Sequence, residues 1–183
     1  ATEFSAARAW GVLERIAGDQ APHGVGTAAN AAVRERIAAE LEALGLEVER
    51  QAAIACRGVT CAPVVNLVAE VPGSHAGGPA VLLTSHYDSV HAGPGVADDL
   101  HGVAIAVETA RALLAGERPV HPVRILVDEG EEVGLLGATA FVEQHPRARE
   151  IAVVVNAEAR GTTGLSSMFE TSDGNAALVS AYL

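Results

Sequence analysis

Short runs of branched apolar residues alternate along the chain with segments of helical periodicity. The runs with strand character are Leu46–Ile54, Val64–Val71, Ala80–Thr84, Val123–Val127 and Ile151–Val155. Such alternation is typical of α/β proteins, in which helices cover the faces of a sheet that contains parallel strands. The final run is short, branched and wholly apolar, so we expect Ile151–Val155 to be a central, buried strand.

Helix-capping signals accompany the helical segments. A side chain that accepts a backbone hydrogen bond stabilises the first turn of a helix, and serine, threonine and aspartate are favoured there. Capping and apolar spacing together predict helices that begin at Ser5, Thr27, Asp98 or Asp99, Leu135 and Asn175. Gly45 and Gly116 stand where the second and third of these helices would end.

The Gly-rich stretch Pro72–Pro79 separates two of the strand-like runs. We expect it to be a hairpin-type connection rather than a domain boundary. A chain of 183 residues can bury a core of its own, so residues 1–183 are expected to form a single domain.

The chain is strongly acidic, with a formal net charge of −11. Nucleic acids and anionic membranes are bound by basic surfaces, so we expect no nucleic-acid partner and no membrane contact by this segment. No apolar run reaches the roughly 18 residues that a membrane-spanning helix requires. The charge is compatible with a cleft that holds cations or a positively charged substrate group.

The two cysteines, Cys56 and Cys61, have a spacing that fits neither a CxxC redox motif nor a paired zinc knuckle. They are either two unrelated thiols or a local disulfide that closes a loop. The disulfide is slightly favoured, and it would imply an oxidising compartment.

Histidine and carboxylate side chains follow the strand-like runs, at the positions where open α/β sheets carry their sites. In chain order these residues are His86 and Asp88, Asp98 and Asp99, the four acids Asp128, Glu129, Glu131 and Glu132, and finally Glu158. Each group alone has an ordinary explanation, such as a surface turn or a helix cap. Four groups of similar chemistry at strand ends are much harder to attribute to chance.

Carboxylates combined with an imidazole are the donor set of a zinc site. Glu131 beside a ligating Glu132 would place a general base next to a Lewis acid, which is what hydrolysis by metal-activated water requires. The acids between Asp128 and Glu132 would repel one another unless a cation or a raised pKa relieves the repulsion.

Three motifs match a known series in order and spacing. They are HYDSV at His86–Val90, GPGVADD at Gly93–Asp99 and GEEVGLLG at Gly130–Gly137. The series resembles the co-catalytic di-zinc aminopeptidases of metallopeptidase family 28. The later segments Asn156–Thr162 and Met168–Thr171 are most similar to its branch of bacterial and vacuolar-membrane-protease-like proteins. The resemblance runs from about Pro22 to the last residue and implies a three-layer α/β/α sandwich with a mostly parallel mixed sheet.

The resemblance also implies a set of metal ligands. His86 would bind the first of two zinc ions, Asp98 would bridge both, and Glu132 would bind the second. Glu158 stands where most of the family has aspartate, and it would complete the ligands of the first zinc. The peptide bond between Asp98 and Asp99 is expected to be cis.

The remaining roles concern the reaction. Glu131 would be the general base and proton shuttle for the bridging water, and Asp88 would orient His86. Arg160 would either contact substrate or act as a surface partner of the acidic cluster. The implied substrate is a peptide with a free N-terminus, from which N-terminal residues are removed. His91 and His101 lie near the site in sequence but are not expected to bind metal.

One departure from the family pattern bears on activity. The second zinc of the family takes a histidine from a later strand end, and no histidine follows Glu158 in this chain. The chain is therefore expected to be the N-terminal two-thirds of a catalytic domain, to bind one zinc or none, and to be weak or inactive by itself. A truncation would leave a sheet edge exposed, so self-association into a homo-oligomer is also expected.

Two alternative functions remain open. One is a zinc acyltransferase of the glutaminyl-cyclase type, although its sequence around the bridging acid differs from the one here. The other is a non-catalytic interaction module of the same fold. The cysteine pair and the branch of the family favour an exported or membrane-anchored parent protein over a cytoplasmic one.

Overall fold

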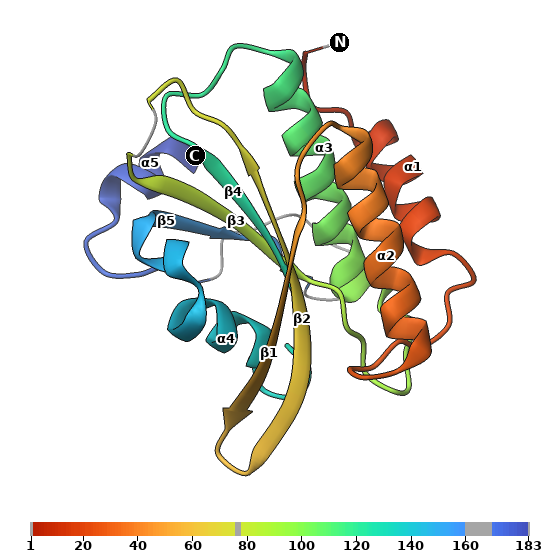
Figure 1. Ribbon diagram of the computed structural model, residues 1–183. Coiled ribbons are helices and arrows are strands. Elements are labelled where there is room, and N and C mark those ends of the chain that lie inside the picture. The colour runs from red at the N-terminus through yellow and green to blue at the C-terminus, as the bar shows by residue number, and fades with distance from the viewer. Residues whose placement is uncertain (1, 76–77, 160–169, 183) are drawn as a thin grey trace.

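The computed structural model describes residues 2–75, 78–159 and 170–182. Its centre is a five-stranded sheet with the strand order β1-β2-β4-β3-β5 (Figure 1). The strands are β1 (Glu49–Arg57), β2 (Thr60–Val71), β3 (Ala80–His86), β4 (Val123–Asp128) and β5 (Ile151–Asn156). β2 is antiparallel to both β1 and β4, whereas β3 is parallel to both β4 and β5.

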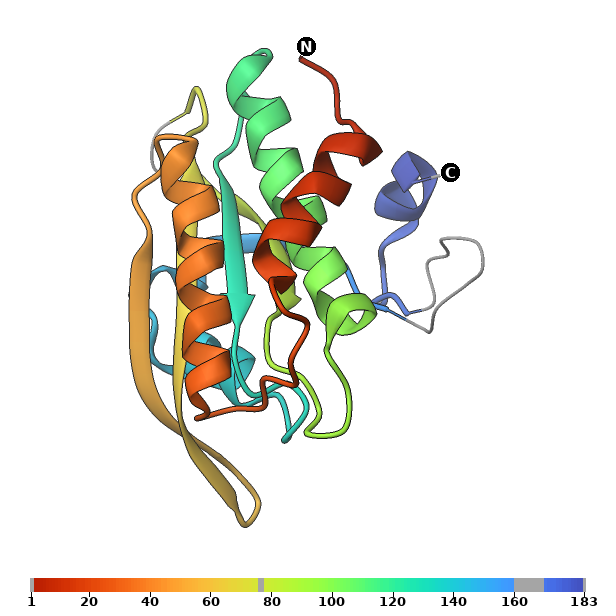
Figure 2. The same ribbon diagram turned by 90° about the vertical axis from the view of Figure 1, so that its right-hand side faces the viewer.

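Helices cover both faces of this sheet. On one face lie α1 (Ala6–Ala17), α2 (Ala28–Ala43) and α3 (His101–Ala115), and on the other lies α4 (Leu136–Gln144) (Figures 1 and 2). Shorter helices complete the described elements: η1 (Val96–Leu100), η2 (Pro146–Glu150) and α5 (Ala176–Tyr182). The predicted α/β class and its three layers are thus confirmed.

The first two helices begin at the predicted caps. Ser5 Oγ accepts a hydrogen bond from the Arg8 backbone N–H (3.4 Å), and Thr27 Oγ1 accepts one from that of Asn30 (3.1 Å). The fourth helix begins one residue later than expected, because Leu135 has a φ of +58°, in the left-handed region that cannot continue a helix.

Apolar cores on both faces hold the sheet in place. The larger core packs helices α1 to α3 against the sheet, and its buried members include Ile16, Ile37, Leu41, Leu67 and Ile125. A smaller cluster lies beneath α4 and is made of Val68, Leu82, Leu126 and Phe141. Because β3 and β4 contribute to both cores, their carboxyl ends are rigidly placed.

The prediction that Ile151–Val155 is a central strand is wrong. β5 pairs with β3 alone and lies at the edge of the sheet formed by the described residues. The side chains of Val154 and Val155 are 54% and 45% exposed. An apolar composition makes a strand suitable for burial on both faces, but strand order decides whether neighbouring elements cover it.

The prediction of a hairpin at Pro72–Pro79 is also wrong. This segment joins β2 to β3, which are not neighbours because β4 lies between them. Ser74 and His75 instead donate backbone hydrogen bonds to the carbonyl groups of Pro119 and Val120, just before β4. A Gly-rich composition is compatible with a hairpin or with a crossover, and the pairing of distant strands decides between them.

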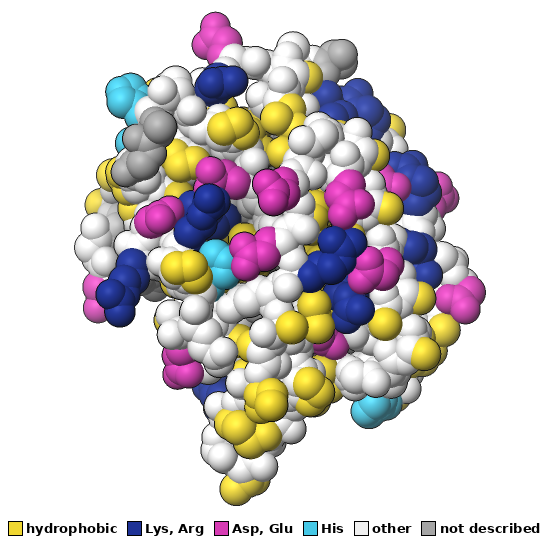
Figure 3. Space-filling model, in the orientation of Figure 1, with side chains coloured by type: hydrophobic (Ala, Val, Ile, Leu, Met, Phe, Trp, Pro, Cys, Tyr) yellow, Lys and Arg dark blue, Asp and Glu magenta, His cyan; other side chains and the backbone are white. Residues whose placement is uncertain are grey.

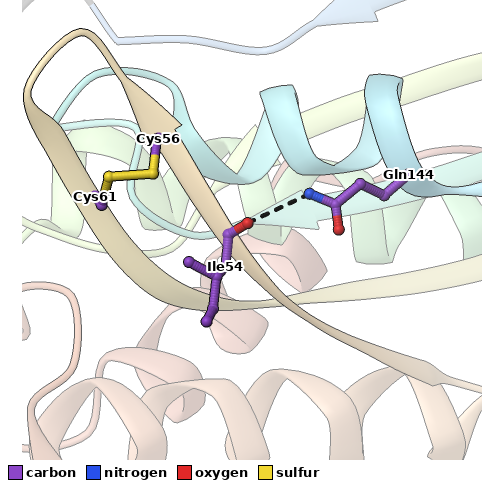
Figure 4. Close-up of a disulfide and its surroundings, with 4 residues drawn as sticks. All are labelled: Ile54, Cys56, Cys61 and Gln144. Atoms are coloured by element: carbon purple, nitrogen blue, oxygen red, sulfur yellow. Dashed lines mark hydrogen bonds between the residues drawn. A yellow bond between two sulfur atoms is a disulfide. The ribbon is translucent and has the colours of Figure 1, made fainter.

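The hairpin of this fold is β1–β2, and a disulfide closes its tip (Figure 4). Cys56 and Cys61 stand directly opposite each other in the antiparallel register, with their sulfur atoms 2.10 Å apart. The disulfide alternative is therefore confirmed. Ile54 and Val59 are exposed on this projecting hairpin, over which Figure 3 shows apolar side chains gathered.

A buried carboxylate ties the N-terminal segment to α3. Glu108 accepts hydrogen bonds from Arg111 Nε (2.7 Å), from Arg8 Nε (3.0 Å) and from the backbone N–H of Ser5 (2.9 Å). The hydrogen bond from Arg111 is the largest cause that lowers the pKa of Glu108, to about 2, and it outweighs the opposing effect of burial.

Replacing Glu108 by glutamine is expected to lower the free energy of unfolding at pH 7 by about 2 kcal/mol, since hydrogen bonds to charged groups contribute about 1.5–3 kcal/mol and both arginines are partly exposed. The folded-state pKa is lowered, so this contribution is complete above the ordinary value of 4.5 and is lost as the pH falls toward 2. The difference in Tm between wild type and variant should therefore shrink from pH 7 to pH 3.

The matched control is Glu40→Gln, because the Glu40–Arg15 pair is exposed. That control should change stability by no more than about 0.5 kcal/mol. A Tm difference for Glu108→Gln that is equal at pH 7 and pH 3 would contradict the role given to Glu108.

Candidate metal centre

The carboxyl ends of β3, β4 and β5 meet at one edge of the sheet because these strands are parallel. His86 is the last residue of β3, Asp128 is the last of β4, and Glu158 follows the end of β5 by two residues. Asp98 lies in η1, directly before α3. Groups that follow separate strands in the sequence therefore converge in space.

The imidazole of His86 is the centre of this cluster, and its side chain is only 2% exposed. Its Nε2 atom lies 3.1 Å from Asp98 Oδ1, 3.6 Å from Glu158 Oε1 and 3.9 Å from Glu131 Oε2. Its Nδ1 atom lies 3.0 Å from the main-chain oxygen of Asp88, to which it donates a hydrogen bond. Nε2 is thus the ring atom presented to the carboxylates.

Electrostatics at this position favour a positive charge. Burial opposes the charged imidazolium, but hydrogen bonds to Asp88 and Glu158 and the charge of Asp99 outweigh it and raise the pKa of His86 to about 12. A histidine held protonated by its neighbours reports a strongly negative potential at its ring. A bound cation would satisfy the same carboxylates in place of that proton.

Asp88 organises two parts of the site. Its main-chain oxygen orients the His86 ring, and its carboxylate oxygen Oδ1 lies 3.6 Å from His86 Nδ1. The carboxylate also accepts backbone hydrogen bonds from Gly130 (2.8 Å), Glu131 (3.0 Å) and Glu132 (3.3 Å). These three donors belong to residues Gly130–Leu135, which we call the acid loop. Asp88 therefore holds both the imidazole and the loop that carries two acids.

The adjacent acids Asp98 and Asp99 point to different partners, and the peptide bond between them is cis, as expected. The Asp98 side chain is 57% exposed and faces His86 Nε2. The buried Asp99 carboxylate accepts hydrogen bonds from the backbone N–H groups of His86 (3.3 Å) and Gly102 (3.2 Å) and lies 3.1 Å from His101 Nδ1. Burial is the main cause that raises the pKa of Asp99, to about 6.

Of the four acids between residues 128 and 132, the two in the acid loop belong to the site. Burial, with the charge of neighbouring acids, raises the pKa of both Glu131 and Glu132. Asp128 lies below them, and burial raises its pKa to about 7. Glu129 turns away to accept a hydrogen bond from the backbone N–H of Val65 (2.6 Å). The crowding seen in the sequence is thus relieved by separation and by protonation.

Glu158 differs from the other acids of the cluster. Burial would raise its pKa, but the hydrogen bond from His86 and one from the backbone N–H of Ala159 lower it overall. Glu158 therefore favours the charged form beside the ring, unlike Glu131 and Glu132. Arg160, the predicted substrate contact, lies outside the described residues.

Two buried polar residues near the site were not singled out as functional candidates from the sequence. His23 exchanges backbone hydrogen bonds with Ser89, donating its N–H to Ser89 Oγ (2.8 Å) and accepting from the Ser89 N–H (3.4 Å). Asn66 lies on β2 and bonds the residues that flank the acid loop. A lone asparagine inside an apolar strand was the available signal for Asn66, whereas nothing local marked His23.

The donor set fits zinc, which binds imidazole nitrogen and carboxylate oxygen. Ligand atoms of His86, Asp99 and Glu158 all lie within 4.8 Å of one another. Asp99 already accepts two backbone hydrogen bonds, whereas the Asp98 carboxylate faces Nε2 from the open side. Asp98 is therefore the better ligand of the two, and Asp99 is better suited to holding the turn in place.

Known proteins of similar sequence include one named as a protease and one named as a metallopeptidase. The chain is 39% identical over 108 residues to the vacuolar membrane protease of Candida dubliniensis, covering 59% of this chain and 12% of that protein. It is 35% identical over 121 residues to endoplasmic reticulum metallopeptidase 1 of Rattus norvegicus, covering 66% and 14%. The chain thus spans less than a fifth of the length of these relatives.

Solved structures support the fold. The glutaminyl cyclase of Porphyromonas gingivalis superposes with a TM-score of 0.71 at 23% identity, over 88% of this chain and 61% of that one. A Zn-dependent exopeptidase from Parabacteroides distasonis gives 0.69 at 22%, over 88% and 63%. Peptidase family M28 matches residues 66–183, which include the histidine and the acids gathered at the strand ends. The chain therefore belongs to peptidase family M28.

Proposed function

We propose that this chain carries the catalytic site of a zinc-dependent exopeptidase that removes N-terminal residues from peptides. The observation that carries the proposal is the convergence of Asp98, Glu131 and Glu158 on the Nε2 atom of buried His86. Membership of a metallopeptidase family supports hydrolysis, and restriction to N-terminal residues is the finer part of the proposal.

The zinc ligands in this proposal are His86, Asp98 and Glu158 for one ion, with Asp98 and Glu132 contributing to a second. Zinc in such a site supplies a Lewis acid that polarises a carbonyl group and lowers the pKa of water. The Asp88 carbonyl accepts the hydrogen bond from His86 Nδ1, so the proton of a neutral ring stays on Nδ1 and Nε2 can act as the zinc ligand.

Glu131 is the proposed general base. Its carboxylate is partly buried beside the imidazole, with Oε2 3.9 Å from Nε2, and its pKa is raised by burial. A carboxylate with a raised pKa is a stronger base toward the nucleophile, and a pKa nearer the operating pH lets the same group later return the proton to the leaving amine. The hydrogen bond from its backbone N–H to Asp88 holds it in this place.

The substrate end of the site is proposed to bind a free α-ammonium group. Burial and then the charge of Asp98 raise the pKa of Glu132, so the Asp98 carboxylate lies within electrostatic reach of Glu132. The net negative charge of the whole acidic cluster, rather than any one zinc-binding carboxylate, would attract a cationic substrate group. Arg160 remains a proposed contact with the rest of the substrate.

We expect the 183-residue chain to retain at most one zinc ion per molecule after dialysis against metal-free buffer. The second position has only the carboxylates of Asp98 and Glu132 among the proposed ligands, whereas protein zinc sites generally use three or four. Elemental analysis measures the ratio of zinc to protein, and His86→Ala is the control that should lose the metal. Two tightly held zinc ions, with turnover of chromogenic aminoacyl substrates, would overturn both the ratio and the expected weak activity.

Glutaminyl cyclisation is the second candidate, because the Porphyromonas gingivalis protein that shares this fold is a glutaminyl cyclase. The two functions are separated by incubating the full-length protein with a peptide that begins with glutamine. Release of the N-terminal residue supports the exopeptidase, whereas cyclisation with loss of ammonia supports the cyclase.

We also propose that the parent protein is exported or membrane-anchored. The names of the relatives place them at the vacuolar membrane and in the endoplasmic reticulum, and the Cys56–Cys61 disulfide suits an oxidising compartment. Within the described residues, no helix combines the length and the apolar character needed to cross a bilayer.

A further inference from the structure

We propose that Asn66 is a positioning residue that holds both flanks of the acid loop and thereby places Glu131 and Glu132. The contacts that carry this inference are independent of the reaction. Only the consequence for catalysis rests on the function proposed above.

The carboxamide of Asn66 bridges the two ends of the loop. Its Oδ1 atom accepts a hydrogen bond from the backbone N–H of Glu129 (3.1 Å), the residue before the loop. Its Nδ2 atom donates one to the main-chain oxygen of Gly137 (2.8 Å), in the first turn of the helix after the loop. Asn66 is fully buried, so water cannot replace either partner without opening the structure.

The orientation of the carboxamide is determined by its partners. Glu129 N–H requires an acceptor and the Gly137 carbonyl requires a donor, so only one of the two amide orientations satisfies both. A second donor hydrogen of Nδ2 goes to Gln51 Oε1 (3.0 Å), and Gln51 in turn donates to the main-chain oxygen of Ala140 (3.2 Å).

Close packing at Gly137 prevents the Asn66 bridge from shifting. A Cβ atom at Gly137 would collide with Asn66 Oδ1 and with the backbone nitrogen and oxygen of Glu129. A hydrogen bond from Leu136 N–H to the Gly130 carbonyl (2.9 Å) closes the neck of the loop. The flanks of the loop therefore meet on one asparagine side chain.

Asn66 and Asp88 hold different parts of the same loop. Asp88 accepts the backbone N–H groups of Gly130, Glu131 and Glu132 inside the loop. Asn66 holds the residues on either side of the loop, and without that bridge only the Glu129–Val65 and Leu136–Gly130 hydrogen bonds would hold its ends. Removing Asn66 should therefore loosen the acid loop while the remainder of the sheet keeps its structure.

Hydrogen–deuterium exchange of the metal-free chain tests this directly. Asn66→Ala should speed exchange of the Glu131–Leu136 amides by about tenfold or more relative to wild type, because two buried hydrogen bonds are lost. Exchange in α3 should be unchanged. If Asn66→Ala does not fold, Asn66→Ser, which also cannot reach both flanks, replaces it.

Two controls separate positioning from general destabilisation. Gln51→Ala removes a partner of Asn66 but keeps both flanks bridged, so it should leave exchange of the acid loop near wild type. Val68→Ala makes a cavity on the same strand, and it should lower Tm without the local effect. Loop exchange in Asn66→Ala no faster than in Val68→Ala would overturn the proposal.

Zinc affinity provides a readout of the consequence. In the full-length protein and in competition with a chelator, Asn66→Ala should bind the second zinc, for which Glu132 is a proposed ligand, about tenfold more weakly than wild type, since partners that orient metal sites typically contribute about 10–100-fold. Val68→Ala should bind zinc normally. Faster loop exchange with unchanged zinc affinity would support the bridge but contradict the proposal that the bridge places the acids. Failure of the exopeptidase assay alone would contradict the proposed function without changing the exchange or the zinc affinity.

Discussion

Replacing Glu131 by glutamine in the full-length protein is expected to lower kcat by about a hundredfold to ten-thousandfold, the range attributed to general acid–base catalysis. Glutamine has the same shape but cannot accept a proton. Its backbone N–H would still donate to Asp88, so the acid loop should keep its structure. Steady-state kinetics measure the loss, and elemental analysis of the same variant should show normal zinc content.

The matched control is Glu143→Gln, on the outer side of α4, where the side chain is exposed and has no part in the site. It should leave kcat near the wild-type value. Retention of full turnover by Glu131→Gln would exclude Glu131 as the base, and loss of zinc together with turnover would show that it acts as a ligand instead.

Replacing Asp88 by asparagine is expected to lower the free energy of unfolding by about 2–4 kcal/mol, because buried hydrogen bonds to a charged group contribute about 1.5–3 kcal/mol each. Part of this loss is offset, since removing one negative charge relieves repulsion among the neighbouring acids. The amide keeps one accepting oxygen but turns an NH₂ group toward backbone donors of the acid loop. Thermal and urea denaturation at pH 6 measure the change.

Asp128→Asn is the control for Asp88→Asn. Burial raises the pKa of Asp128 to about 7, so at pH 6 the amide replaces a group that is mostly uncharged. It should not lower stability at pH 6. Because the pKa of Asp128 is raised from 3.8 to about 7 in the folded state, wild-type stability falls as the pH rises from about 4 to about 7, so the asparagine variant should gain relative to wild type over that range and keep the gain at pH 8. A larger loss at pH 6 for Asp128→Asn than for Asp88→Asn would reverse the roles assigned to them.

Local signals predicted the elements of this fold well. The caps at Ser5 and Thr27 act within three residues, so their hydrogen bonds are visible in the sequence. The disulfide was similarly local, because Cys56 and Cys61 face each other across a tight hairpin. Strand order was not local. The pairing of β4 between β2 and β3 overturned the predicted hairpin at Pro72–Pro79.

The prediction that β5 is a buried central strand is wrong for the same reason. The apolar character of Ile151–Val155 is a property of the segment, but coverage of a strand is a property of its neighbours. Asn66 illustrates the converse, since a polar residue in an apolar strand gains its role from partners 63 and 71 residues away. No window of the sequence contains both the asparagine and the loop that it holds.

The sequence by itself determined which side chains could form the site, because parallel strands bring their carboxyl ends together whatever their order. His86, Asp98, Glu131 and Glu158 were identifiable from their positions after strands and from their chemistry. The family resemblance already named Asp98 as the ligand, but only the tertiary structure decided how the acids lie around the imidazole, which acids lie buried below it, and what holds the acid loop. Those outcomes depend on distances between segments far apart in the chain, and hydrogen bonds of that range leave no periodic trace in the sequence.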